Sequence, residues 1–565
     1  MAAIESQSEV AVKPRHPYAT AVWWVAFFAV VPSMCAQEAA APRHTGVPQD
    51  WSQHHIVFSR DALARHPDLM YREPRVLHQA MQRWQLPNWG LFHVAQPLAT
   101  AVGNSGSHRD WSVSTLGGRL APGMFPAKFS FDPGAPPDCT NDYVVFGLAA
   151  TGVTGGRANL VAFNNLYVNS AGTGFCSGTA PTVLFAYNIT TVPGTSGGRI
   201  SISPILSLDG KKIGFVESVP GTSRHAIFHV LTWVAGRGTI GNAAAPTSMT
   251  SLTFSPSFNS TTSSPWIDYA TDTVYLGADN GVVYQITGVF NGTPTLTGAP
   301  WPAIVSTNNR LTPPVLDSVL GMLMVGSANG NLYQIDTSLG AVVGALAVGQ
   351  FGAASSGIVA APAVDVTNGT IFAVSANGGS SAVLVEVDTA SFLELARGNI
   401  GLGSSSGTPL KLNEPAFSNL YFNNPSSGVV RLCGTGAADT SPWQYSFGFT
   451  GSTMDTVPSF SQQLLTSTAA RCTGWTEFFN PNVGGVLGTD FFFFGLTQDC
   501  TGLGTSGGCV AEITGTNTTP VTATVNGGTS GIIVDNYSTV LQASSIYFVA
   551  ANVNTAYKFT QNGLQ

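Results

Sequence analysis

Carboxylates are the first residues to examine for chemistry, because this chain has only 30 Asp and Glu among 565 residues. Hydrolysis of a glycosidic bond needs two carboxylates that face each other across a cleft. The acidic residues that are candidates for this role are Asp268, Asp272, Asp279, Asp317, Glu414, Asp455, Glu477 and Asp490. Most of them lie in expected turns, where Asp is common because its side chain hydrogen-bonds to the local backbone. The sequence does not bring any two of them together, so no catalytic residue is assigned.

Histidine offers a second kind of chemistry, because seven of the ten histidines lie between residues 44 and 108. A metal site built from His54, His55 and His108 is the hypothesis that this clustering suggests. However, adjacent histidines on a strand point to opposite faces, and no Cys or carboxylate completes a ligand set with recognisable spacing. We therefore assign no metal-binding residue.

Glycine-rich motifs offer a third kind of chemistry. The pattern Gly-x-Ser-x-Gly occurs at residues 194–198 and 504–508. A nucleophile elbow must lead from a strand into a helix, and neither stretch does so in the expected structure. Residues 401–407 resemble a phosphate-binding loop but lack its Lys and its following helix. All three stretches are therefore interpreted as loops, and no cofactor-binding residue and no cofactor are assigned.

A hairpin repeated near the middle of the chain organises these residues. Its copies are residues 274–286, 324–336 and, more loosely, 371–378 with 383–388. Each copy has an apolar strand, a turn with Asn-Gly and a second apolar strand, which in the loosest copy follows a longer turn. Asn and Gly accept the positive φ of a tight turn. The copies recur every 48 residues or so, about the length of a propeller blade. With similar segments up to residue 559, this pattern predicts an all-β, seven- or eight-bladed β-propeller with an irregular N-terminal arm containing one short helix.

The repeat resembles the blade repeat of quinoprotein-type β-propellers, and residues 203–215 are similar to the repeat of Tol-type propellers. The resemblance implies a propeller fold and, in the enzymes of the family, a quinone with calcium ligands, a stacking tryptophan floor and often an adjacent Cys-Cys pair. This chain has no adjacent cysteines. The repeats lack the family's Trp-bearing docking segment, and none of Trp266, Trp301, Trp443 and Trp475 lies in such a context. A non-catalytic member is therefore expected.

The first 36 residues are expected to be a signal peptide. Lys13 and Arg15 precede the apolar run 19–31, which is too short to span a bilayer comfortably, and small residues surround a cleavage point after Ala36. Two alternatives stay open: lipidation at Cys35, and retention of the segment as an anchor.

Residues 37–135 differ from the rest of the chain and are expected to form a basic, His- and Trp-rich arm or cap. Nine basic and five acidic residues lie from Arg43 to Lys128, whereas the remaining chain is acidic. The arm is interpreted either as lying across an acidic propeller edge or as a solvated loop. The pair Glu73-Pro74 predicts the start of a helix with Val76, Leu77, Ala80, Met81 and Trp84 on one face. Residues 136–565 are assigned to the propeller.

Seven cysteines are present, and six of them follow the expected leader. An even number in an exported protein suggests disulfides. Proximity in the chain favours the pairs Cys139–Cys176, Cys433–Cys472 and Cys500–Cys509. Free buried thiols are the alternative.

Together these patterns predict an exported, non-catalytic β-propeller that binds a protein or glycan as a scaffold in the periplasm, at the cell surface or outside the cell. A net charge of −7 argues against nucleic acid as a partner. We expect a monomer with no stable membrane span after removal of the leader. A propeller enzyme, either a quinone-dependent oxidoreductase or a carbohydrate-active hydrolase or lyase, is the alternative.

Overall fold

The computed structural model describes residues 46–58, 65, 69–84, 107–118, 120, 123–132, 136–192, 197–219, 225–255, 260–349, 357–379, 381–401, 414–434, 441–466, 470–480, 488–504, 507–535, 538, 540, 542–550 and 553–560. They belong to one compact unit, Ala41–Gln565. The expected signal peptide, including the apolar run 19–31 and Cys35, lies outside the described residues.

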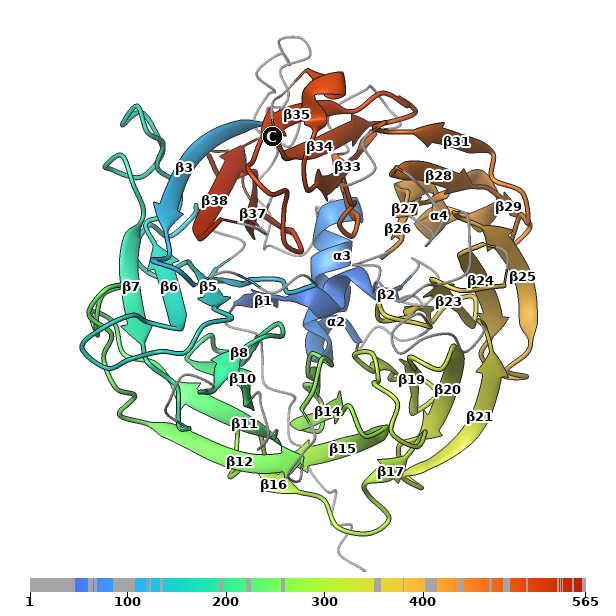
Figure 1. Cartoon of the computed structure of the whole chain (residues 1–565), viewed down its shortest axis with the longest axis horizontal. Helices are drawn as coiled ribbons and strands as arrows, with labels where there is room; N and C mark the ends of the chain where they lie inside the picture. The colour runs from blue at the N-terminus through green and yellow to red at the C-terminus, as the bar shows by residue number, and fades with distance from the viewer. Residues whose placement is uncertain are drawn as a thin grey trace, which may run out of the picture. The chain divides into compact units, whose positions relative to one another are not determined.

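Eight mainly antiparallel sheets surround a common centre as the blades of a propeller (Figure 1). From the inner to the outer strand, blades 1 and 2 are β1 (Val47–Gln49), β4 (Ala127–Ser130), β5 (Tyr143–Gly147), β6 (Leu160–Asn164) and β7 (Thr182–Tyr187), then β8 (Arg199–Ile200) with β9 (Ile205–Leu206), β10 (Lys212–Val219), β11 (His225–Thr232) and β12 (Met249–Ser255). Blades 3 and 4 are β13 (Trp266–Asp268), β14 (Thr273–Gly277), β15 (Val282–Thr287) and β16 (Thr295–Leu296) with β17 (Ala303–Ile304), then β18 (Val315–Asp317), β19 (Met322–Gly326), β20 (Asn331–Asp336) and β21 (Ala341–Ala347).

The second half of the ring repeats this arrangement. Blades 5 and 6 are β2 (Ile56–Val57), β22 (Ala363–Asp365), β23 (Thr370–Ser375), β24 (Val383–Asp388) and β25 (Glu394–Asn399), then β26 (Ala416–Phe417), β27 (Val430–Gly434), β28 (Trp443–Phe447) and β31 (Phe460–Gln463), with a separate hairpin of β29 (Phe449–Thr450) and β30 (Thr453–Met454). Blades 7 and 8 are β32 (Thr476–Asn480), β33 (Thr489–Leu496), β34 (Cys509–Thr514) and β35 (Val521–Thr524), then β36 (Ile533–Asp535), β37 (Ser545–Val549), β38 (Thr555–Thr560) and β3 (His108–Ser114). The predicted propeller is confirmed, with eight blades.

The repeated hairpins form the two middle strands of blades 3, 4 and 5. In blade 3, β14 pairs with β15 across the turn that contains Gly281, which has a φ of +82°. A Cβ at Gly281 would lie 1.8 Å from the carbonyl oxygen of Ser306, so the turn needs glycine for both its conformation and its space. Gly330 occupies the same position in blade 4, with a φ of +88°.

Blade 8 combines strands that lie far apart in the chain. Strand β3 comes from the N-terminal part, and it pairs antiparallel with β38, the last strand of the chain. This pairing closes the ring, because blade 8 would otherwise lack its outer strand. The prediction that the chain divides into arm and propeller at residue 136 stays a prediction, although β3 and β4 precede that residue and lie in blades.

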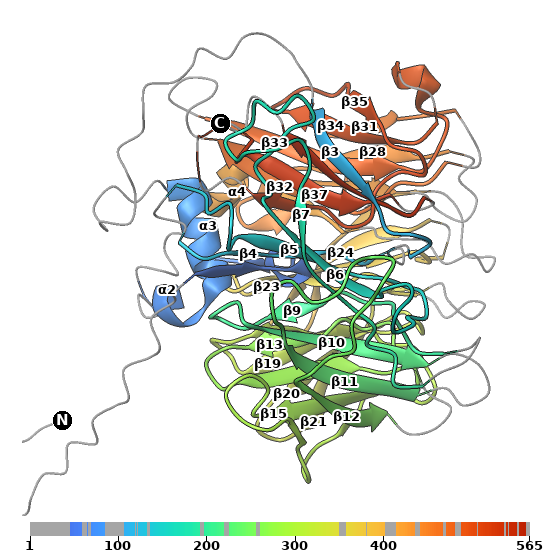
Figure 2. The same ribbon diagram turned by 90° about the vertical axis from the view of Figure 1, so that its left-hand side faces the viewer.

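Helical elements are few and short. The longest described helix, α3 (Pro74–Trp84), begins at the predicted residue and lies near the centre of the ring with α2 (Leu69–Arg72) (Figure 1). Figure 2 shows both helices at one face of the propeller. Other helical segments with described bounds are η1 (Trp51–His54), α4 (Asn419–Asn423), η2 (Pro425–Ser427) and η4 (Cys500–Leu503). No helix among the described residues has the length and apolar character needed to cross a bilayer.

The core lies between neighbouring blades rather than within any one of them. Blades 7 and 8, for example, share a buried cluster in which Phe478, Phe491 and Phe493 pack with Ile546 and Phe548. Each blade therefore depends on its neighbours for burial of its apolar faces.

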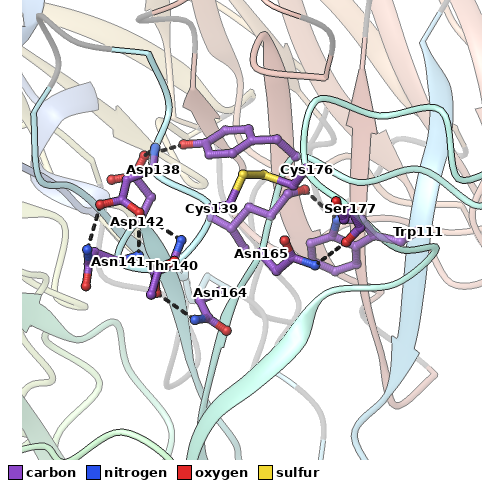
Figure 3. Close-up of a disulfide and its surroundings, with 12 residues drawn as sticks. Trp111, Asp138, Cys139, Thr140, Asn141, Asp142, Asn164, Asn165, Cys176 and Ser177 are labelled. Atoms are coloured by element: carbon purple, nitrogen blue, oxygen red, sulfur yellow. Dashed lines mark hydrogen bonds between the residues drawn. A yellow bond between two sulfur atoms is a disulfide. The ribbon is translucent and has the colours of Figure 1, made fainter.

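All three predicted disulfides are present: Cys139–Cys176, Cys433–Cys472 and Cys500–Cys509. The first lies in blade 1 beside a network of hydrogen bonds around Asp142 (Figure 3). Asp142 accepts the backbone N–H groups of Phe131 and Asp138 at 2.9 and 3.1 Å and the hydroxyl of Tyr167 at 2.8 Å. The disulfide thus fixes a polar loop that also carries its own hydrogen bonds.

Candidate functional site: an N-terminal segment in the centre of the ring

Residues 46–58 and 69–84, called here the N-terminal segment, pass through the centre of the propeller. Strand β1 pairs antiparallel with β4 of blade 1, and β2 pairs parallel with β22 of blade 5. These blades stand on opposite sides of an eight-bladed ring, and Figure 1 shows β1 and β2 on opposite sides of the centre. The chain between the two strands therefore crosses the place where many propellers have a channel.

Trp51 anchors this crossing to blade 3. Asp50 caps the short helix η1 by accepting the backbone N–H of Ser52 at 2.9 Å, and this cap directs the chain into the centre. The Trp51 indole donates to the carbonyl oxygen of Pro265 at 3.0 Å, and its ring meets Trp266 edge-on at 5.8 Å. Trp51 is only 2% exposed, so nearly its whole side chain is buried in the contact.

A polar stripe on α3 makes further contacts between the N-terminal segment and the blades. Arg75, Gln79 and Arg83 are spaced four residues apart and so share one face of the helix. The Arg75 guanidinium lies 4.0 Å from the Trp266 ring and donates to the carbonyl oxygen of Ile267 at 3.0 Å. Gln79 makes two hydrogen bonds at β2, donating to the carbonyl oxygen of Ile56 at 2.6 Å and accepting the backbone N–H of Phe58, the residue that follows the strand, at 3.1 Å. Arg83 reaches blades 6 and 7, as described below.

The predicted apolar face of α3 is only part of its packing. Val76 and Ala80 are buried, but Leu77 and Met81 are partly exposed, while the polar stripe is buried. The side chain of Trp84 lies outside the described residues. Sequence reasoning missed the stripe because Arg and Gln at helical spacing ordinarily mark a face turned to water.

Arg83 pairs with Glu477 of β32 in blade 7. Its guanidinium donates to both carboxylate oxygens of Glu477, at 3.1 Å for one of them, and lies 3.5 Å from the ring of Phe422 in blade 6. Burial raises the pKa of Glu477 above its usual value; the Arg83 guanidinium opposes this shift, whereas repulsion from Asp490 adds to it. Part of the basic charge of the N-terminal region is thus neutralised inside the propeller.

Two of the candidate acids, Glu477 and Asp490, therefore lie together, on neighbouring strands of blade 7. Their arrangement does not match glycoside cleavage, because they are in direct hydrogen-bond contact instead of facing each other across a cleft. Asp490 also accepts the backbone N–H of Asn419 at 2.8 Å, which ties it to blade 6.

The other candidate acids are dispersed, and several confirm the turn interpretation. Asp317 accepts the N–H groups of Val319 and Leu320, and Asp268 accepts that of Ala270, all at 3.0 Å. The remaining four acids have separate surroundings. Asp272 accepts backbone N–H groups from residues 290 and 291, and Asp279 lies in the β14–β15 turn. Glu414 lies 3.6 Å from His55, and Asp455 accepts the hydroxyl of Thr450.

The three histidines considered for a metal do not meet. His54 stacks on Phe125 and His55 lies beside Trp51 in the centre, whereas His108 lies in the outer strand of blade 8. Burial lowers the pKa of His54 to about 3, so its imidazole is neutral at neutral pH. Within the part of the chain that the structure describes, no three His, Cys, Asp or Glu side chains are placed to share a metal ion.

The four tryptophans considered for a cofactor floor are distributed among different blades. Trp266 belongs to β13, Trp443 to β28, and Trp475 stacks on Phe494 in blade 7 at 4.3 Å. Trp301 donates to the carbonyl oxygen of Thr337 at 3.2 Å. The glycine-rich stretches 194–198, 401–407 and 504–508 lie partly outside the described residues.

A small cavity of about 50 Å³ remains between the N-terminal segment and blades 6, 7 and 8. Its lining includes His54, Gln79, Arg83, Trp475 and Glu477. This space holds a few water molecules at most, and it is far smaller than the pockets that enclose substrates. The arrangement in the centre of the ring is thus suited to holding the chain's own segment.

Sequence reasoning also missed two buried lysines. Lys128 of β4 lies 3.0 Å from Asp535 of β36 and so joins blade 1 to blade 8. Lys558 of β38 lies 2.5 Å from Asp110 of β3. For Lys558 the available signal was a Lys between apolar residues inside an expected strand, because such a charge must be paired when it is buried.

Comparisons with known proteins add the following. No protein-family description matches this chain, and no curated protein sequence matches it. Among solved structures, BamB from Moraxella catarrhalis is similar over 81% of this chain and 98% of its own, with 13% identity and a TM-score of 0.43. Saccharomyces cerevisiae Sqt1 is similar over 81% and 99%, with 10% identity and a TM-score of 0.45. Chaetomium thermophilum Sqt1, bound to the N-terminus of the ribosomal protein L10, is similar over 74% and 93%, with 13% identity and a TM-score of 0.45. At these identities the likeness concerns the fold alone, and the eight-bladed β-propeller rests on the strand pairing itself.

Proposed function

We propose that this chain is an exported, non-catalytic β-propeller of the quinoprotein-like type that binds a protein or glycan as a scaffold at the cell envelope or outside the cell. The observation that carries the proposal is the N-terminal segment, which occupies the centre of the ring and contacts blades 1, 3, 5, 6 and 7. The surface left for a partner is the outside of the blades and the loops between their strands.

Export is supported by two independent features. Residues 19–31 have the length and composition of a signal-peptide core and follow two basic residues. Three disulfides are typical of proteins that fold in an oxidising compartment. Fractionation of the source cells, with N-terminal sequencing of the protein recovered, tests this part: a cytosolic protein that keeps Met1 would contradict it.

Exposed apolar residues on neighbouring blades give the first surface to test. Val319, Leu320, Leu339 and Leu393 lie in turns of blades 4 and 5 and are 42%, 47%, 56% and 62% exposed. Apolar side chains grouped at one part of a surface are common at binding interfaces.

Binding is tested with the full chain produced by an exporting host. The protein is immobilised and exposed to a glycan array and, separately, to purified envelope proteins of the source organism. The expected result is saturable binding. The variants Leu339→Asp and Leu393→Asp should weaken it, whereas Val521→Asp, in blade 7, should leave it unchanged. Turnover of a sugar substrate, or of an alcohol with added quinone, by a protein that shows no saturable binding would contradict the proposal and favour an enzyme.

A further inference from the structure

Lys558 and Asp110 form a fully enclosed pair where the first and last strands of blade 8 meet. Their side chains are 0% exposed, and Lys558 Nζ lies 2.5 Å from Asp110 Oδ2. Asp110 occupies the bulge in β3, between the pairs Arg109–Phe559 and Trp111–Lys558. The bulge turns the carboxyl group toward the neighbouring lysine.

Aromatic rings lie beside this buried pair, and the imidazole of His108 lies 3.4 Å from its other carboxyl oxygen, Asp110 Oδ1. Trp111 lies against Tyr547 of blade 8 at 6.2 Å and against Phe163 of blade 1 at 6.1 Å between ring centroids. Lys558 is directly opposite Tyr547 in the strand register, so both face the same side of the blade. In such surroundings a neutral amine and a neutral carboxylic acid are nearly as stable as the ion pair.

The hydroxyl of Thr560 bridges the two reacting groups. It donates to Asp110 Oδ2 at 2.5 Å and accepts from Lys558 Nζ at 3.4 Å. A proton can therefore pass from the amine to the carboxyl oxygen through this hydroxyl, without any water. Burial also lowers the pKa of Lys558 to about 8, although the neighbouring Asp110 opposes that shift.

We propose that Lys558 and Asp110 condense to an amide cross-link after the propeller has folded. The ion pair first exchanges one proton, which gives an amine and a carboxylic acid. The Nζ lone pair then attacks Asp110 Cγ, the bond from Cγ to the hydroxyl oxygen breaks, and one amine proton leaves with that oxygen as water. No oxidant, reductant or cofactor takes part, and the folded chain supplies the proximity that such a reaction needs.

The position of the pair gives the link a structural consequence. Lys558 and Asp110 are 448 residues apart, so the amide would close almost the entire described propeller into one covalent ring. The pairing of β3 with β38 completes blade 8, and the link would prevent β3 from separating. A cross-link across so long a loop strongly restricts the unfolded chain.

A second lysine–aspartate pair in the same region provides an internal control. Lys128 Nζ lies 3.0 Å from Asp535 Oδ2, but its hydroxyl neighbour Ser130 contacts the amine, at 2.5 Å. No hydroxyl among the described residues bridges Lys128 and Asp535 as Thr560 bridges the other pair. We expect this pair to stay an unlinked ion pair.

The test is mass spectrometry of the full chain from an exporting host, reduced and denatured before measurement. The expected intact mass is one water molecule below the mass that the mature sequence and reduced cysteines give. Proteolysis should yield a branched peptide that joins the fragments containing Asp110 and Lys558, while the fragments containing Lys128 and Asp535 stay separate. An intact mass without this loss, with both fragments recovered unlinked, would overturn the proposal.

Variants assign the loss to this pair. Lys558→Arg keeps the charge but should restore the full mass; a water loss that persists in this variant would count against the proposal. Asp110→Asn should still link, now with loss of ammonia instead of water. Thr560→Val should fold, as judged by circular dichroism, but accumulate the link at least tenfold more slowly; an unchanged rate would remove Thr560 from the reaction.

Discussion

Arg83 and Glu477 are 394 residues apart in the chain and form an ion pair in the centre of the propeller, with side chains that are only 4% and 5% exposed. Arg83 also donates to Asn419 at 3.3 Å and lies over the ring of Phe422. One side chain of α3 therefore joins blades 6 and 7 to the N-terminal segment. The charge that makes this contact is almost completely buried.

The ion pair is predicted to be costly to break from either side. Replacing Arg83 with Met, or Glu477 with Leu, leaves a buried polar partner without its counterpart and should lower the free energy of unfolding by about 3–5 kcal/mol. The double variant Arg83→Met with Glu477→Leu should lose less than the single Arg83→Met variant, because no buried charge remains. Chemical denaturation followed by tryptophan fluorescence measures all three.

An exposed pair in blade 5 is the matched control for this prediction. Arg397 and Glu394 also form an ion pair, but both side chains are 32% exposed. Arg397→Met should therefore cost about 1 kcal/mol or less. Equal losses at Arg83 and Arg397 would show that the central pair is not buried in solution.

Trp51 is predicted to hold the N-terminal segment against blade 3. Trp51→Ala removes the edge-on contact with Trp266 and the hydrogen bond to Pro265. The expected loss is about 3–5 kcal/mol in the free energy of unfolding, because no other side chain refills the space. Limited proteolysis should also cut the variant first within residues 46–84. Leu420→Ala, at a side chain that is 46% exposed, should change neither measurement appreciably.

The propeller was predictable from sequence because its determinants are local. The Asn-Gly turn of the β19–β20 hairpin, with glycine at Gly330, is a short-range signal, and it recurs in neighbouring blades. The disulfides were predictable for the same reason, since each joins cysteines close in the chain, such as Cys500 and Cys509 with a separation of nine residues. The start of α3 at Pro74 was also a local signal.

The centre of the ring was not predictable, because its determinants are long-range. Arg75 and Arg83 have the spacing of a solvated helix face, and their burial depends on Ile267 and Glu477, which lie 192 and 394 residues away. Strand β2 has only two residues, too few for any periodicity, and acquires its conformation from β22. Pairing of this kind is visible only once the blades are in place.

The disulfides are predicted to contribute unequally to stability. Cys139–Cys176 closes a loop with a separation of 37 residues, whereas the separation of Cys500 and Cys509 is nine. Loop-closure entropy then gives a loss of about 4 kcal/mol for Cys139→Ser with Cys176→Ser, and about 3 kcal/mol for Cys500→Ser with Cys509→Ser. Denaturation of the two double variants measures this order. Thiol titration of the denatured, unreduced protein provides the check on the bonds themselves, and six free thiols would contradict them.

Glu386 is predicted to make the folded protein less stable as the pH rises. It is a buried residue of β24 that accepts the backbone N–H of Met454 at 2.6 Å. Burial raises its pKa from 4.5 to about 7; the Met454 hydrogen bond opposes this shift, and repulsion from Asp365 adds to it. Between these two values the folded state keeps a proton that the unfolded state has lost, so the folded state is progressively disfavoured as the pH rises. The loss from this one group between pH 4.5 and 7 should be roughly 3 kcal/mol.

The variant Glu386→Gln isolates this contribution from that of every other titrating group. A Gln side chain keeps an oxygen acceptor for Met454 but carries no charge at any pH, so its stability should not fall through this mechanism. Urea denaturation of both proteins at half-unit steps from pH 4.5 to 8 gives the difference between their free energies of unfolding. That difference should grow with pH in favour of Glu386→Gln and level off at low pH, where the wild-type carboxyl is protonated in both states. A difference that stays constant over this range would mean that Glu386 ionises at its ordinary pKa in the folded protein, and hence that water reaches the space between β24 and the β29–β30 hairpin.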